Sequence, residues 1–144
     1  MKRLMAVVLF TSAFLCFAVS SAAQNEERFK AHLAPVPMDA AMRQSVTGSG
    51  SATAVLAGNK LSITVTFAGL GGPATAARLH RGVATGVRGS AFHDLTISKA
   101  TSGMLSASFD LTPDQAESLR KGKVYIQISS EKAPDGNLWG WLLR

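Results

Sequence analysis

The stretch GSGSATAVLAGNKLSITVTF, residues 48–67, decides the fold class of this chain. From residue 61 onward, apolar and hydroxyl side chains alternate strictly, which is the period of a strand with one buried face. Residues 48–57 are small and compatible with a strand, and Gly58-Asn59-Lys60 is a turn signal. The stretch therefore predicts an antiparallel hairpin. Its core-facing residues are Leu61, Ile63, Val65 and Phe67.

Further short strands are predicted on both sides of this hairpin. Before it, residues 28–33 alternate, and residues 34–37 must be extended or turning because two prolines remove two backbone donors. Residues 38–44 form either a brief helical turn or a loop. The later strands are expected at residues 75–80, 91–98, 104–111, 124–130 and 137–143, with Pro134-Asp135-Gly136 separating the last two.

One helix is predicted near residues 113–121. Thr112 can cap it, Pro113 fits its first turn and Gln115 completes a capping-box pattern. Gly122 can end it in a left-handed conformation. Several short strands, one short helix and frequent turns predict an all-β, single-domain antiparallel β-sandwich with Greek-key connections, of immunoglobulin-like or superoxide-dismutase-like architecture.

The first 23 residues are predicted to be a cleaved signal peptide, which leaves residues 24–144 as the domain. A positive start is followed by an apolar run and by the small residues Ser21-Ala22-Ala23. The competing interpretation is an uncleaved membrane anchor, but the run is short for a membrane span and a cleavage site follows it. No stable membrane insertion is expected after cleavage. Leu15 before Cys16 is too bulky for the usual lipoprotein pattern. The expected location is periplasmic or extracellular.

Composition excludes several classes of function. Residues 24–144 contain no cysteine, which rules out thiolate catalysis and cysteine metal sites. The net charge of +6 is spread along the chain without a basic run, so nucleic acid is not an expected partner. Weak attraction to an acidic polysaccharide or an anionic membrane surface remains open. No nucleophile elbow, paired carboxylates or phosphate loop is present, so the protein is not expected to be an enzyme.

Four strings in the second half, in their order and spacing, resemble the chordin-type (CHRD) domain, a module of chordin and of many bacterial secreted proteins. They are Ala76-Ala77-Arg78-Leu79-His80, Leu111-Thr112-Pro113, Val124-Tyr125-Ile126-Gln127-Ile128 and Gly136-Asn137-Leu138-Trp139-Gly140. The resemblance covers residues 28–143 and implies an all-β extracytoplasmic module. Chordin binds growth factors largely through separate cysteine-rich repeats, which this chain lacks, so that activity is not implied.

The resemblance suggests metal binding as a family possibility, but the residues differ here. The family's histidine pair on one strand is Arg78 and His80 in this chain, and a third histidine position is Ser129. Only His80 could be a ligand, and the permanent cation of Arg78 would repel a divalent metal. No metal or other cofactor is expected, and metal binding through His80 is the alternative. His32 is expected to be solvated, and His93 to be structural.

The candidate ligand-binding residues are Arg78, His80, Tyr125, Trp139 and Trp141. If Leu138 and Leu142 point into the core, strand parity places these five outward, where they suit a sugar or a partner protein. Alternatively, residues 35–43 cover the tryptophans, or the parity is reversed. The sequence thus predicts a secreted or periplasmic, non-catalytic binding or structural module. Its partner would be an unknown envelope or extracellular protein or polysaccharide.

Overall fold

The computed structural model describes residues 25–37 and 39–144, so the predicted signal peptide lies outside the described residues. The elements, in chain order, are β1 (Glu26–Pro35), a 3-10 turn η1 (Met42–Gln44), β2 (Ser49–Ala57), β3 (Lys60–Ala68), β4 (Ala74–Arg81), β5 (Ser90–Leu95), β6 (Gly103–Asp110), α1 (Pro113–Arg120), β7 (Val124–Ser130) and β8 (Ala133–Trp141). In this part of the chain, no helix is long and apolar enough to cross a membrane.

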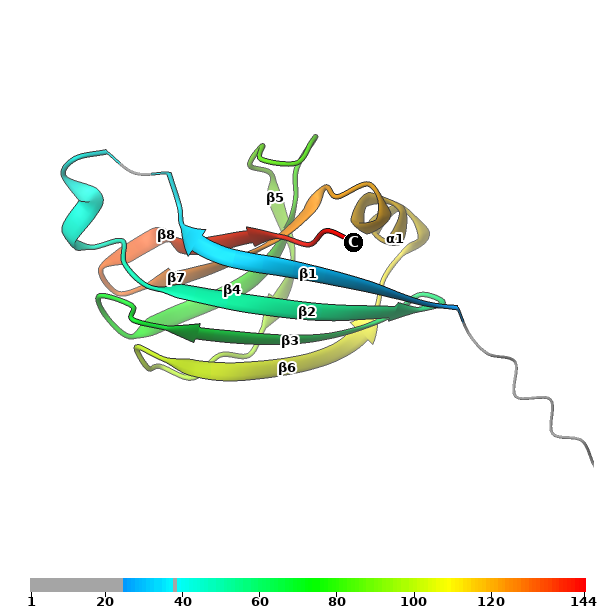
Figure 1. Cartoon of the computed structure of the whole chain (residues 1–144), viewed down its shortest axis with the longest axis horizontal. Helices are drawn as coiled ribbons and strands as arrows, with labels where there is room; N and C mark the ends of the chain where they lie inside the picture. The colour runs from blue at the N-terminus through cyan, green and yellow to red at the C-terminus, as the bar shows by residue number, and fades with distance from the viewer. Residues whose placement is uncertain (1–24, 38) are drawn as a thin grey trace, which may run out of the picture.

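All eight strands join one antiparallel sheet in the order β5-β4-β7-β8-β1-β2-β3-β6. The sheet curls into a nearly closed, barrel-like shape (Figure 1). Strand β1 makes this possible because it pairs with β2 over Glu26 to Leu33 and with β8 at Ala34 and Pro35. The fold is therefore all-β, as predicted, whereas a sandwich of two separate sheets with Greek-key connections is not confirmed.

The predicted hairpin is present and supplies much of the core. Strands β2 and β3 pair from Ser49↔Ala68 to Ala57↔Lys60. The four apolar residues of β3 are at most 4% exposed, while the hydroxyl residues between them face outward. Among the described residues, the main core cluster extends from Phe29 on β1 to Leu142 after β8.

The two edge strands of the sheet, β5 and β6, are closed by side chains rather than by a backbone ladder. The His93 ring on β5 stacks on Phe109 of β6, with ring centroids 3.5 Å apart. Both side chains are half-buried, and Phe92, Ile97 and Phe109 pack on the core at this seam. His93 thus has the structural role expected from the sequence.

Helix α1 has the cap expected from the sequence. The Gln115 amide donates to Thr112 Oγ1 at 3.2 Å, and the Thr112 amide donates to Gln115 Oε1 at 2.9 Å. Leu119 is fully buried and docks the helix on the core. Gly122 follows the helix at φ 67°, the left-handed conformation that favours glycine.

The predicted position of the last turn, at Pro134-Asp135-Gly136, is wrong. Strand β8 begins at Ala133, which pairs with Ser130, so the turn is Glu131-Lys132 and Pro134-Asp135-Gly136 lies within the strand. The β7–β8 pairing shifts register between Ile128 and Ser130, and the extra residues of this irregularity lie on β8, between Ala133 and Leu138. Turn residues located in a strand next to such an irregularity carry the same local signal as a true turn.

Candidate functional site

Strands β4, β7 and β8 lie side by side and bring the five predicted site residues to one outer face. His80 pairs with Tyr125 and Tyr125 with Trp141; one step along, Arg78 pairs with Gln127 and Gln127 with Trp139. Leu138 and Leu142 are fully buried on the inner face. The predicted strand parity is therefore present, and the alternative of a reversed parity is wrong.

Four of these residues form one aromatic cluster with Tyr125 at its centre. The ring centroid of Tyr125 is 4.9 Å from that of His80, which stacks on it, and 4.5 Å from that of Trp141. Trp139 meets Tyr125 edge-on at 5.7 Å, and the two tryptophans are 6.0 Å apart. Such geometries are favourable for aromatic pairs, so the cluster is a packed unit rather than a row of independent side chains.

Tyr125 lies beneath the surface, although its parity is outward. It is 1% exposed because the loop between β4 and β5, residues 82–89, folds over it. Its hydroxyl donates to the Gly89 carbonyl at 3.2 Å and accepts from the Gly89 amide at 3.1 Å. Tyr125 was predicted to contact a ligand, but its burial makes it the support of the cluster instead.

The β4–β5 loop is the part of the site that the sequence analysis missed. The Gly82 amide donates to the Lys123 carbonyl at 2.9 Å, and Thr85 Oγ1 donates to the Gly122 carbonyl at 2.7 Å. A Cβ at Gly82 would overlap the Val87 carbonyl oxygen, and one at Gly89 would overlap the backbone of β4. The three glycines of this loop were the available signal for such a close approach.

His80 also holds this loop. Its Nδ1 donates to the Gly89 carbonyl at 2.9 Å, so the proton is on Nδ1 because a carbonyl oxygen only accepts. Within residues 25–37 and 39–144, no three histidine, cysteine, aspartate or glutamate side chains are grouped as metal ligands would be. The geometry gives His80 a positioning role, and metal binding through it stays a prediction.

Both tryptophans are half-buried. Trp139 packs beside Met42 on a small second cluster of Val36, Val46 and Ala133. The predicted alternative, that residues 35–43 fold over the tryptophans, is therefore present in part for Trp139. Trp141 instead lies under the β4–β5 loop, since a Cβ at Gly82 would be 3.1 Å from its ring.

The arginine beside the tryptophans is not the one predicted. The Arg78 side chain is exposed and donates from Nε to Asp94 Oδ1 of β5 at 2.8 Å, on the side away from β8. Arg88 of the β4–β5 loop lies over Trp139, with its guanidinium carbon 5.5 Å from the ring centroid. Strand parity could not indicate Arg88 because a loop has no parity.

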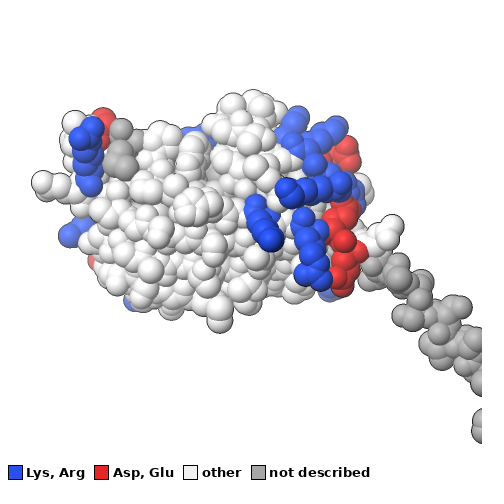
Figure 2. Space-filling model, viewed as in Figure 1, with Lys and Arg blue, Asp and Glu red and all other residues white. Residues whose placement is uncertain are grey.

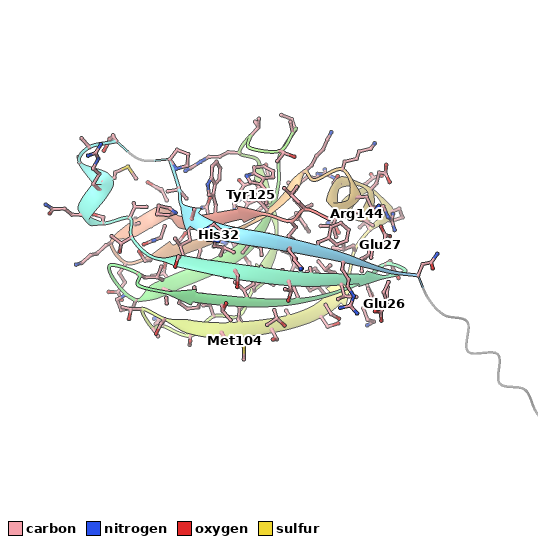
Figure 3. All side chains as sticks on the ribbon, in the orientation of Figure 1. Glu26, Glu27, His32, Met104, Tyr125 and Arg144 are labelled. Carbon is pink, nitrogen blue, oxygen red and sulfur yellow. The ribbon has the colours of Figure 1, made fainter. Side chains whose placement is uncertain are left out.

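The remaining predicted features lie away from this cluster. His32 is exposed on the outer face of β1 (Figure 3). Asn137 is fully buried and structural: it accepts from Ser130 Oγ at 2.8 Å, and its Nδ2 donates to the Thr47 carbonyl at 2.6 Å. This pairing satisfies the buried polar side chains of Asn137 and Ser130 within the β7–β8 pair.

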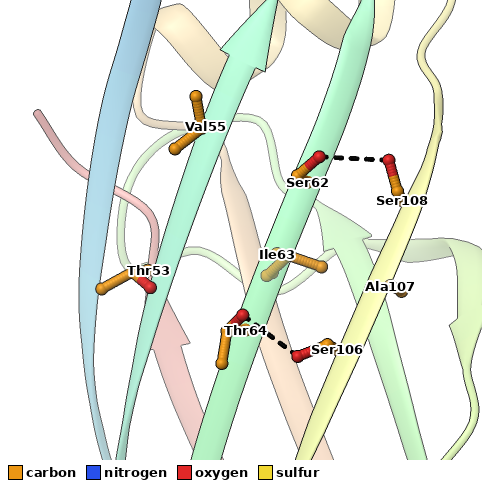
Figure 4. Close-up of a pocket in the computed structure, with 8 residues that line it drawn as sticks. All are labelled: Thr53, Val55, Ser62, Ile63, Thr64, Ser106, Ala107 and Ser108. Atoms are coloured by element: carbon orange, nitrogen blue, oxygen red, sulfur yellow. Dashed lines mark hydrogen bonds between the residues drawn. The ribbon is translucent and has the colours of Figure 1, made fainter.

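A second surface feature is a shallow depression of about 450 Å³ on the outer face of β2, β3 and β6 (Figure 4). None of its lining residues is charged. Its hydroxyls pair across neighbouring strands, Ser62 with Ser108 and Thr64 with Ser106, each at 3.1 Å. Each pair uses one hydroxyl proton, and no aromatic or charged residue lines the depression, so it offers less recognition chemistry than the aromatic cluster.

Comparison with known proteins agrees with the architecture. The family model of the CHRD domain matches residues 29–142, from buried Phe29 on β1 to buried Leu142 after β8. Comparison with curated proteins finds no match, and comparison with solved structures finds none either. Because the family model covers nearly the whole chain, the protein belongs to the CHRD domain family.

Proposed function

We propose that the protein is exported and acts outside the cytoplasm as a non-catalytic binding module. The positive start, the apolar run and Ser21-Ala22-Ala23 support export. Intact-mass measurement of the exported protein tests this step, and we expect a chain that begins at Gln24. A chain that retains Met1, or one with lipid on Cys16, would contradict it.

The ligand is proposed to bind at the outer aromatic face, which we define as His80, Arg88, Trp139 and Trp141. One observation carries this proposal: two adjacent tryptophans stay half-buried beside the arginine of a loop instead of entering the core. Tryptophan and arginine dominate binding hot spots because each offers a large contact area together with a directed polar group. Burial of Tyr125 beneath them holds the face in place before a ligand arrives, which lowers the entropic cost of binding.

An envelope or extracellular protein or polysaccharide is the expected ligand class. Retention of envelope extract on immobilised residues 24–144 tests it, with half of the extract treated with protease beforehand. Loss of the retained material after proteolysis would identify a protein ligand, and its survival would identify a polysaccharide.

Arg88→Ala and Trp139→Ala test the face itself. Each substitution should weaken the binding free energy of the retained ligand by about 1 to 3 kcal/mol, which would be seen as reduced retention. Met104→Ala is the matched control because Met104 is 67% exposed on β6, away from the face. Equal retention by all three variants would refute the proposed face.

Stability measurements separate binding from folding in these variants. Arg88 is exposed, so its substitution should change the free energy of unfolding by less than about 0.5 kcal/mol. Trp139→Ala should cost more, about 1 to 3 kcal/mol, because the half-buried ring packs on the second cluster and meets Tyr125 edge-on. Arg88→Ala therefore reports on the ligand with little contribution from stability.

A further inference from the structure

Three of the four large apolar side chains that are exposed in the described residues belong to the β4–β5 loop and to the C-terminal segment, which meet. Val83 is 75% exposed, Val87 is 44% exposed and Leu143 is 45% exposed. The fourth, Met104, points away from the opposite side of the sheet (Figure 3). Scattered single apolar residues are normal on a protein surface, but three exposed on two segments that meet require an explanation.

The two segments that carry these three side chains are neighbours. Val83 and Val87 are in the β4–β5 loop, which meets the C-terminal segment over Gly122. Thr85 of this loop donates to the Gly122 carbonyl, and the position of a Cβ on Gly122 would be 3.1 Å from Thr85 Oγ1 and 3.0 Å from Leu143 Cδ2. We call Val83, Val87 and Leu143 the apolar ridge.

Two lysines adjoin the apolar ridge. Lys30 exchanges two backbone hydrogen bonds with Leu143, at 2.7 and 2.9 Å, and the Lys123 carbonyl accepts from Gly82 beside Val83. In the described part of the chain, neither ammonium group lies within ion-pair distance of a carboxylate. Figure 2 shows lysines and arginines gathered between the β4–β5 loop and the end of the molecule where β1 begins, with acidic residues among them at that end.

Three acidic residues near this surface are already paired with cations: Glu26 with Arg28, Glu27 with Arg120 and Arg144, and Glu117 with Lys121. Asp114 of α1 lies beside Arg81 and is in no ion pair among the described residues, so it can offset one positive charge. The charges of Lys30 and Lys123 are therefore uncompensated by any of these ion pairs. The surface combines protruding apolar side chains with excess positive charge.

We propose that the apolar ridge docks on a membrane surface that carries anionic lipids. Bilayer interfaces bind protein surfaces through buried apolar side chains together with the attraction of lysines to anionic headgroups. The ridge is a protrusion rather than a groove, and a deformable bilayer can accept it without a complementary shape. Docking would be peripheral and reversible, and it would leave the sheet outside the bilayer.

Flotation of residues 24–144 with vesicles tests the proposal. We expect binding to vesicles of phosphatidylcholine with phosphatidylglycerol, little binding to phosphatidylcholine alone, and release at high salt. Val83→Asp should weaken partitioning by about tenfold or more, and Lys30→Glu and Lys123→Glu by about fivefold each. Matched controls are Met104→Asp, at a side chain that is also well exposed, and Lys99→Glu, and both should bind as the parent does.

Several results would overturn the proposal. They are a lack of binding to the anionic vesicles at low salt, equal losses in the ridge and control variants, and binding without preference for anionic lipid. Displacement by millimolar inorganic phosphate at constant ionic strength would indicate a phosphate site instead. If Val83→Asp does not fold, as thermal melting would show, the two lysine variants decide the question alone. Vesicle binding that survives Trp139→Ala would separate this surface from the outer aromatic face.

Discussion

Replacement of Tyr125 by phenylalanine should loosen the β4–β5 loop without disturbing the aromatic cluster. The substitution removes one oxygen atom from a side chain that is 1% exposed and keeps the ring between His80 and Trp141. The Gly89 carbonyl keeps its bond from His80 Nδ1, but the Gly89 amide loses its partner. Gly89, which anchors the loop over the cluster, thus keeps a partner for its carbonyl but has none for its amide.

The magnitude follows from these two bonds. A typical hydrogen bond contributes about 0.5 to 1.5 kcal/mol, and a buried unsatisfied donor costs about 1 to 3 kcal/mol. Gly89 is half-buried, so water can reach its amide once the loop lifts, which removes the upper part of that range. We expect Tyr125→Phe to lower the free energy of unfolding by about 1 to 2 kcal/mol.

Urea denaturation and amide exchange check this expectation. The denaturation midpoint should fall with an unchanged slope, and exchange at Gly89 should accelerate about tenfold for a local loss of about 1.4 kcal/mol. Acrylamide should quench the tryptophans more strongly because the loop covers Trp141. Ser62→Ala is the control, since it removes an exposed cross-strand hydroxyl pair and should cost less than about 0.5 kcal/mol. If Tyr125→Phe is as stable as the Ser62→Ala control and amide exchange at Gly89 does not change, the Tyr125 hydroxyl does not hold the loop.

The fully buried Leu119 should cost about 2 to 5 kcal/mol when replaced by alanine, whereas Thr112→Ala should cost about 1 kcal/mol by freeing a terminal amide; equal, negligible effects in denaturant melts would mean that helix α1 is undocked. Gly140→Ala would place a Cβ 2.7 Å from a backbone carbonyl oxygen of β1, so melting should show a loss of about 1 to 3 kcal/mol; wild-type stability would mean that β1 and β8 pack less closely. The hydrogen bond from Arg120 holds the pKa of Glu27 below its usual value, so the ion pair stabilises the fold fully above about pH 5 and less as pH falls through the lowered pKa. Because this pair is solvent-accessible, Glu27→Gln should remove less than about 1 kcal/mol and flatten the acid side of the stability–pH profile; an unchanged profile would contradict the assignment.

The elements that could be predicted are those whose determinants are close together in the chain. The alternation of β3 depends on residues two positions apart, and the cap of α1 depends on Thr112 and Gln115, three positions apart. Strand parity similarly predicted that Trp139 and Trp141 point away from the core. A local pattern is sufficient here because the same few residues both carry the signal and make the interaction.

Strand parity predicted which site residues face outward, but it did not predict what covers them or which loop residues join them. Parity placed Tyr125 outward but could not indicate that residues 82–89 return over it, because the bonds to Gly89 join residues 36 positions apart. It also selected Arg78, which Asp94 holds on the neighbouring strand, rather than Arg88 in the loop. The direction of a strand side chain is a local property, whereas its cover depends on the path of other segments.

The sequence by itself determined the all-β class, the central hairpin, the capped helix and the outward side of the aromatic residues, because short-range periodicity and capping encode each of them. Only the tertiary structure decided that β1 joins both halves of the sheet, that His93 and Phe109 close the seam, and that a glycine-containing loop buries Tyr125. These features depend on contacts between segments distant in the chain. Their geometry follows from the curvature of the whole sheet, which no single stretch of sequence encodes.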